Sequence, residues 1–119
     1  MKFENANVLI TGGASGIGKI MGRMALERGA RRFIIWDINL AGIEQTRKEL
    51  SSYGKVKGYI VNVADNDVVT AAYRKTVEDC GPIDILINCA GIVTSNKTFD
   101  QQTTEEIVRT MNINAIAPM

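Results

Sequence analysis

The chain of 119 residues contains no histidine, only two cysteines and two prolines, and few aromatic residues. Without histidine, and with two scattered cysteines, we expect no metal site, no disulfide-stapled scaffold and no histidine-based catalytic triad. An excess of one charge is missing too, because 14 Lys+Arg and 13 Asp+Glu leave a net charge of +1. Nucleic acid or an anionic membrane surface would need a basic face, so neither is an expected partner.

Long apolar runs are also absent. No stretch of about 18 apolar residues occurs, so we expect no segment that crosses a bilayer. The first residues, Met1–Asn5, lack the apolar run of a signal peptide. Hydrophobic residues make up 45% of the chain, enough for the core of one domain. These features predict one cytoplasmic α/β domain over residues 1–119, in which Cys80 and Cys89 stay reduced.

Strand-like and helix-like patterns alternate four times along the chain. Apolar runs predict strands at residues 7–10, 33–36, 56–63 and 83–89, the last apolar enough to be covered on both faces. Apolar residues at helical spacing predict three helices. The first begins near Gly16 and ends at Gly29, the second runs from Leu40 to Leu50, and the third covers positions 68–77 and ends before Gly81. A capping box, Thr103 to Glu106, opens a fourth helix. This order predicts a Rossmann-type, doubly wound parallel sheet in three α/β/α layers.

The end of the chain does not fit a finished domain. The predicted fourth helix runs on to Met119 with no stop signal except Pro118, and no strand follows it. The fourth strand would then be a long apolar edge, which intact proteins avoid. We therefore expect a longer domain, truncated here after the fourth strand and the start of the fourth helix. The bare strand would pair with a neighbouring molecule.

A glycine-rich turn joins the first predicted strand to the first helix. Gly12 permits the tight turn, Gly16 lets a pyrophosphate approach the backbone, and Gly18 allows close helix packing. The helix N-terminus offers free N–H groups and its positive dipole end to the phosphates. A purely structural turn is the less favoured alternative, because the string lies between a strand and a helix. The predicted cofactor-binding residues of this turn are Gly12, Ser15, Gly16, Ile17 and Gly18.

An acidic residue ends the second predicted strand. Asp37 lies 19 positions past Gly18, where a carboxylate can accept hydrogen bonds from both ribose hydroxyls of an adenosine. It would repel a 2′-phosphate, and the residues that follow, Ile38 and Asn39, are not basic. The sequence therefore predicts NAD rather than NADP. A turn-forming aspartate is the alternative interpretation.

Two motifs carry a resemblance to a known family. Thr-Gly-x-x-x-Gly-Ile-Gly resembles the cofactor turn of the classical short-chain dehydrogenase/reductases, and Asn88-Cys89-Ala90-Gly91 resembles their Asn-Asn-Ala-Gly motif. The resemblance extends from the first strand into the fourth helix. It implies that Asn88 braces the central sheet and that the backbone of Ala90 and Gly91 lies against the cofactor ribose. Cys89 departs from the family's second Asn, and we expect it to be tolerated there without new thiol chemistry.

The same resemblance implies two further positions. Asn62 and Val63 stand where many relatives have Asp-Val, the pair that meets the adenine ring, and Asn62 can still donate and accept there. The family's fourth helix carries an Asn that holds a water of the proton relay. Asn114 is the predicted catalytic residue, because the segment around it resembles the family's Asn-x-x-small-Pro pattern. Helical periodicity alone leaves Asn112 open.

The family's main proton-transfer groups are not expected in this chain. The resemblance implies a Ser, together with a Tyr and a Lys four residues later, all beyond Met119. Tyr53 and Lys57 have that spacing, but they straddle a predicted helix end and strand start. We interpret them as part of a solvated loop.

The resemblance implies an NAD-dependent oxidoreductase that moves a hydride between nicotinamide and a small alcohol or ketone, as a homo-oligomer. The 119-residue chain would carry the cofactor-binding half and be inactive alone. A non-catalytic nucleotide-binding or interaction module is the alternative. A Rossmann-like methyltransferase is less favoured, because its turn and fourth-strand motifs differ. The substrate is not predicted, since the family's substrate loops would follow Met119.

Overall fold

The computed structural model describes residues 2–89 and 115–116. In this part of the chain the strands form one sheet in the order β3-β2-β1-β4-β5. The first four of these strands are parallel to one another, which confirms the predicted Rossmann-like α/β fold. The elements are β1 (Asn7–Thr11), α1 (Gly16–Glu27), β2 (Arg32–Asp37), α2 (Leu40–Leu50), β3 (Val56–Ile60), α3 (Asn66–Cys80), β4 (Ile85–Asn88) and β5 (Ala115–Ile116).

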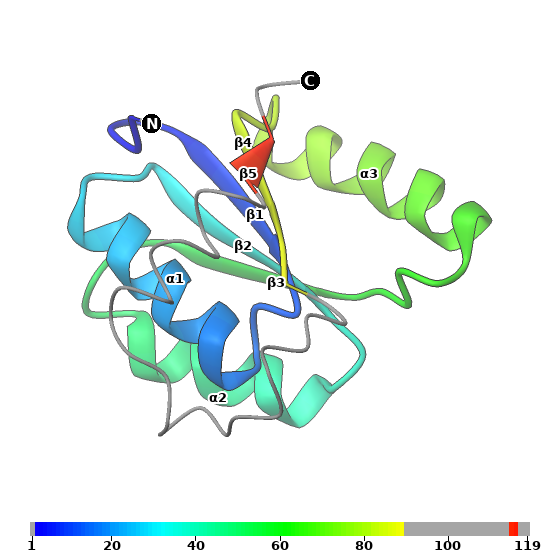
Figure 1. Cartoon of the computed structure of the whole chain (residues 1–119), viewed down its shortest axis with the longest axis horizontal. Helices are drawn as coiled ribbons and strands as arrows, with labels where there is room; N and C mark the ends of the chain where they lie inside the picture. Colours follow the sequence, from blue (N-terminus) through cyan, green and yellow to red (C-terminus); the bar gives the residue numbers. More distant parts are fainter. Residues whose placement is uncertain (1, 90–114, 117–119) are drawn as a thin grey trace.

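Helices cover both faces of the sheet: α1 and α2 lie on one face and α3 on the other (Figure 1). Successive residues of a strand point to opposite faces, so each strand supplies both cores. Val8 and Ile10 pack in the core under α1 and α2, whereas Leu9 packs in the core under α3. All of β1 is buried, as expected for a central strand covered on both sides.

The third strand ends earlier than its apolar pattern predicts. The prediction of a strand over 56–63 is wrong beyond Ile60, because the backbone turns at Asn62. The side-chain oxygen of Asn62 accepts from the N–H of Ala64 at 3.0 Å, and its carbonyl accepts from the N–H of Asp65 at 3.1 Å. Asp65 then caps α3 by accepting from the N–H groups of Asp67 and Val68. The N–H of Val61 still donates to the carbonyl of Asp37 in β2 at 2.9 Å, and from Asn62 onward the local polar contacts take the place of sheet pairing.

The fourth strand also differs from the prediction, at its start and at its outer edge. It begins at Ile85, because the Asp84 carboxylate accepts from the N–H of Asn7 at 2.8 Å. Its outer edge pairs antiparallel with β5, with Leu86 opposite Ile116 and Ile87 opposite Ala115. The expectations of a bare edge and of a helix through residues 115–116 are therefore wrong.

The pairing of β4 with β5 has a physical reason. An open strand edge presents a row of N–H and C=O groups, and a neighbouring segment of the same chain satisfies them. The edge of β4 consequently gives no reason for a partner molecule. The remainder of the predicted fourth helix, with Asn112 and Asn114, lies outside the described residues. None of the helices within 2–89 is long and apolar enough to cross a membrane.

Candidate nucleotide-binding site

The glycine-rich turn is held by hydrogen bonds to its own backbone and to β2. Gly12 has a φ of +72°, which only glycine adopts readily, and its N–H donates to the carbonyl of Trp36 at 2.7 Å. Its carbonyl accepts from the N–H of Ser15 at 3.1 Å and from the Ser15 hydroxyl at 2.7 Å. The turn is thus closed before α1 begins at Gly16.

The N-terminus of α1 is free of side-chain caps within the described part of the chain. Ser15 is the N-cap residue, but its hydroxyl bonds back to Gly12 and not to the first turn of the helix. The first turn contains no acidic residue, and Ser15 and Gly16 are both exposed. Uncapped N–H groups and the positive end of the helix dipole suit this position to an anion such as a phosphate.

Gly18 explains how α1 starts so close to the turn. A Cβ at this position would overlap the carbonyl oxygen of Gly12 and lie 2.9 Å from the Cα of Gly13. The close approach that the spacing predicts is therefore present, although it is made to the turn's own backbone and not to the strands. Ile17, the residue before it, is half-buried and packs against the core under α1 and α2.

Asp37 lies at the carboxyl end of β2 and ties the turn to the loop that follows. One carboxylate oxygen accepts from the N–H of Ala14 at 3.1 Å, and the other accepts from the N–H of Asn39 at 3.1 Å. Asp37 therefore does have the turn-forming role that was the alternative interpretation. These two bonds leave part of the hydrogen-bonding capacity of its carboxylate unused. Each carboxylate oxygen has a second lone pair, so the group can still accept bonds from a ligand.

A hollow of about 160 Å³ opens beside the turn. It brings together four residues that the sequence placed in one cofactor site although they come from three separate segments: Gly12, Asp37, Asn62 and Val63. Of the described residues that line it, Asp37 is the one that carries a charge. The described residues that line it are Gly12, Trp36, Asp37, Ile38, Val61, Asn62 and Val63.

Asn88 joins the ends of the two central strands. The hydroxyl of Thr11 donates to the side-chain oxygen of Asn88 at 2.7 Å. The N–H of Cys89 donates to the carbonyl and to the hydroxyl of Thr11, both at 3.1 Å. The chain order reverses between β1 and β4, and parallel α/β sheets bind ligands at such a point. Ala90 and Gly91, the next two predicted contacts, lie outside the described residues.

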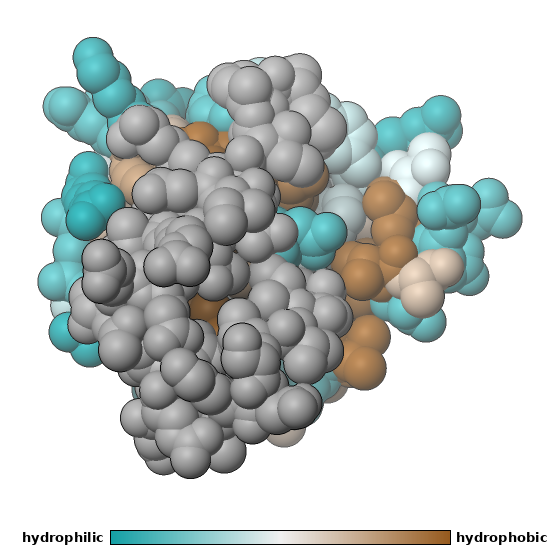
Figure 2. Space-filling view, in the orientation of Figure 1, coloured by the Kyte–Doolittle hydropathy of each residue, from teal (hydrophilic) through white to brown (hydrophobic). Residues whose placement is uncertain are grey.

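A larger hollow, of about 510 Å³, lies between α3 and the ends of the central strands. Apolar surface is visible in this region beside α3 (Figure 2). Trp36 and Val63 line both hollows, which are therefore neighbours. Its lining within the described part of the chain is Leu9, Thr11, Trp36, Val63, Asn66, Val69, Thr70, Tyr73, Leu86 and Asn88.

The sequence placed Trp36 only at the end of the second predicted strand, residues 33–36. The structure gives it a second role, because its carbonyl holds the N–H of Gly12 and it lines both hollows. Its place directly before Asp37 was the one available signal. Ile38, 71% exposed, also lines the smaller hollow and was not predicted to do so.

Tyr53 and Lys57 do not form a catalytic pair. Tyr53 follows the end of α2, whereas Lys57 lies within β3, as the interpretation of a helix end and a strand start requires. Each has a different cation–π partner: the guanidinium of Arg23 lies 5.3 Å from the Tyr53 ring, and the Lys57 ammonium lies 5.7 Å from the Tyr59 ring. Among the described residues, no group of three or more His, Cys, Asp or Glu is placed to hold a metal ion.

Cys89 is expected to be unreactive despite its place beside the site. Both cysteines are free and buried. Burial raises the pKa of the Cys89 thiol to about 12, so the reactive thiolate is about one part in ten thousand at pH 8. We expect an aromatic disulfide reagent to label neither thiol of the folded chain within minutes, and to label both after denaturation. Rapid labelling in the folded chain that Cys89→Ser abolishes would contradict this expectation.

The sequence matches the short chain dehydrogenase family over residues 6–119. This chain belongs to that family. It is 32% identical over 111 residues to estradiol 17-beta-dehydrogenase 11 of Rattus norvegicus, covering 92% of this chain and 37% of the relative. It is 36% identical over 115 residues to 3-oxoacyl-acyl-carrier-protein reductase FabG of Thermotoga maritima, covering 96% of this chain and 46% of the relative. The chain thus spans less than half the length of these relatives.

Solved short-chain dehydrogenases share the fold. NAD⁺-bound xylitol dehydrogenase superposes with a TM-score of 0.72 at 23% identity, over 95% of this chain and 44% of its own. Levodione reductase superposes with a TM-score of 0.69 at 29% identity, over 92% and 44%. The L-sorbose reductase of Gluconobacter frateurii, solved with NADPH and L-sorbose, gives 0.67 at 24% identity, over 93% and 44%.

Proposed function

We propose that this chain binds the adenosine and pyrophosphate parts of a nicotinamide dinucleotide, as the cofactor half of an oxidoreductase that interconverts small alcohols and ketones. The observation that carries the proposal is the meeting of Gly12, Asp37, Asn62 and Val63 around one hollow beside the N-terminus of α1. Membership of the short-chain dehydrogenase family supports the reaction class. The bound nicotinamide would supply the hydride acceptor or donor.

Each part of the site suits one part of such a ligand. The N–H groups at the start of α1 would face the pyrophosphate, since no side chain of the first turn competes for them. Asp37 would accept from the adenosine ribose, and Asn62 and Val63 would flank the adenine ring. At the end of β4, the cofactor would lie alongside Asn88, Ala90 and Gly91. Asn114 stays the predicted relay residue.

Asp37 also supports a preference for NAD over NADP. Among the described residues it is the one charged residue in the lining of the smaller hollow, so no described side chain there would compensate a 2′-phosphate. Both cofactors occur among proteins of this fold, as xylitol dehydrogenase and L-sorbose reductase show. The preference therefore rests on this chain's own residues.

Two further inferences accompany this proposal. Two free, buried cysteines favour a reducing compartment such as the cytoplasm. A homo-oligomer stays a prediction of the family resemblance. A non-catalytic module or a methyltransferase is not favoured, because the family match and the similar proteins are dehydrogenases and reductases.

Cofactor titration tests the proposal directly. The chain has a single tryptophan, Trp36, which lines the site, and tryptophan emission overlaps the absorption of reduced nicotinamide. We expect saturable quenching by NADH, with binding at least about ten-fold weaker for NADPH because of charge repulsion at Asp37. S-adenosylmethionine serves as the control ligand. A chain that unfolds cooperatively on heating, yet binds neither dinucleotide, would refute the proposal.

A further inference from the structure

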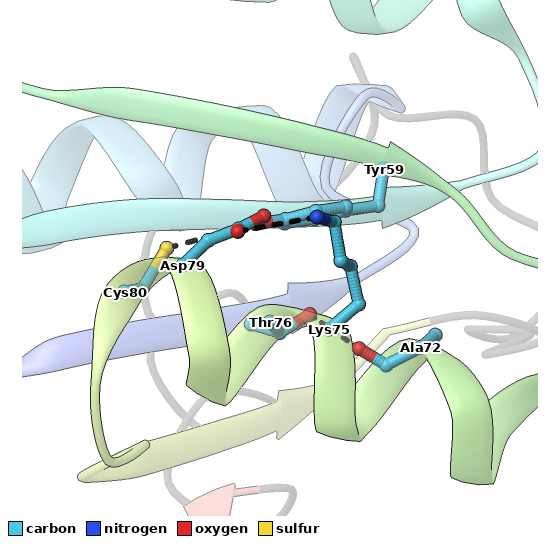
Figure 3. Close-up of polar contacts among 6 residues, drawn as sticks. All are labelled: Tyr59, Ala72, Lys75, Thr76, Asp79 and Cys80. Carbon is cyan, nitrogen blue, oxygen red and sulfur yellow. Dashed lines mark hydrogen bonds and ion pairs between the residues drawn. The ribbon is translucent and has the colours of Figure 1, made fainter.

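A buried hydrogen-bond relay connects α3 to the strand that carries Asp37. The indole N–H of Trp36 donates to the hydroxyl of Thr76 at 3.1 Å. The Thr76 hydroxyl in turn donates to the carbonyl of Ala72, one helical turn earlier, at 2.7 Å (Figure 3). Thr76 is completely buried and Trp36 is 4% exposed. The hydroxyl therefore satisfies the indole where water does not reach it.

The surroundings make this relay the polar contact that fixes the indole. Apolar side chains pack around Trp36, among them Leu9 and Val61. On the side toward α3, however, Trp36 borders the hollow of about 510 Å³. A side chain next to open space can change its rotamer without meeting a close-packed wall. The bond to Thr76 removes that freedom.

Two contacts connect Trp36 to the cofactor site, so a movement of Trp36 would be transmitted to it. Its carbonyl accepts from the N–H of Gly12 at 2.7 Å, so its backbone supports the glycine-rich turn. The next residue is Asp37, whose carboxylate accepts from the N–H of Ala14 in the same turn. Trp36 is thus linked to the turn directly, through its carbonyl, and through the carboxylate of Asp37.

We propose that Thr76 is a positioning residue for cofactor binding, acting through the indole of Trp36. The proposal rests on the proposed function, since it assigns Thr76 a part in holding the dinucleotide site. Within the described part of the chain Thr76 lines neither hollow, and its hydroxyl bonds to Trp36 and Ala72. Its effect on binding must therefore pass through Trp36.

A second buried threonine provides a matched control. Thr46 lies in α2, on the opposite face of the sheet, and is as completely buried as Thr76. Unlike Thr76, its hydroxyl makes no hydrogen bond within the described part of the chain. Thr46→Val therefore removes a buried hydroxyl without removing a bond, whereas Thr76→Val removes the acceptor of the Trp36 indole.

The test compares NADH affinity, measured by calorimetry, with the emission spectrum of the sole tryptophan. We expect Thr76→Val to shift the Trp36 emission to shorter wavelength and to weaken NADH binding about five-fold, as the loss of one buried hydrogen bond predicts. Thr76→Ser keeps the hydroxyl and should restore both. Thr46→Val should change neither.

A double-mutant cycle decides whether the effect passes through Trp36. Trp36→Phe removes the indole N–H but leaves the Thr76 hydroxyl bonded to Ala72, so in this background Thr76→Val should change NADH affinity less than two-fold. The proposal is overturned if Thr76→Val shifts the emission but leaves NADH affinity within two-fold. It is also overturned if Thr76→Val weakens binding equally in both backgrounds. Failure of the unmutated chain to bind NADH would instead refute the proposed function.

Discussion

Gly18→Ala is expected to lower the free energy of unfolding by about 1–3 kcal/mol and to weaken NADH binding by at least about ten-fold. Two effects oppose each other at this position. Alanine favours a helix over glycine by about 1 kcal/mol. Against this, the new Cβ would overlap the carbonyl oxygen of Gly12, a backbone atom that cannot rotate away. Since that carbonyl also accepts both bonds from Ser15, the overlap should prevail and open the turn.

Urea unfolding and NADH titration measure the two effects of Gly18→Ala, and Gly42→Ala is the control. Gly42 is also helical, but the atoms nearest to a Cβ there would all be side-chain atoms: Asn39 Nδ2 at 3.2 Å, Asn39 Cγ at 3.3 Å and Ala14 Cβ at 3.4 Å. We expect Gly42→Ala to change the free energy of unfolding by less than about 1 kcal/mol. If Gly18→Ala proved as stable as Gly42→Ala and bound NADH normally, the close approach at Gly18 would have no importance for the site.

The sequence predicted the parts of the site that depend on short spacings. The strand, glycine turn and helix of residues 7–27 are contiguous, so periodicity and three glycines sufficed to place them. Asp37 was found for the same reason, because it directly follows a strongly apolar strand. The gathering of Asn62 and Val63 beside it required the strand order, which the alternation of helices and strands implied.

Most contacts between distant residues were beyond sequence reasoning, although the family resemblance did imply that Asn88 braces the sheet without naming Thr11 as its partner. The bond between Trp36 and Thr76 joins residues 40 positions apart, and the bond between Thr11 and Asn88 joins residues 77 apart. Neither pair has a sequence separation by which it could be told from any other pair of residues in the core. The end of β3 was missed for another reason: residues 61–63 are apolar enough for a strand, but the side chain of Asn62 bonds the backbone and starts a turn.

Asp37→Asn should reduce the preference for NADH over NADPH by about ten-fold or more, mainly by strengthening NADPH binding. A carboxylate and a 2′-phosphate a few ångström apart at a partly exposed site repel by about 1–2 kcal/mol, and the amide removes that repulsion. The amide oxygen of asparagine can still accept one of the two backbone N–H bonds that Asp37 makes to Ala14 and Asn39. The fold should therefore survive, and the ratio of the two dissociation constants from calorimetry is the measurement.

Asp65→Asn is the matched control for this charge change. Asp65 is an exposed aspartate that caps α3 and lines neither hollow. Asparagine caps helices as well as aspartate does, so this variant should keep the stability and the cofactor preference of the unmutated chain. If both variants shifted the NADH to NADPH ratio equally, the preference would come from the overall charge of this end of the sheet. If neither shifted it, Asp37 would be only a turn residue, and the choice of cofactor would be made by residues outside the smaller hollow.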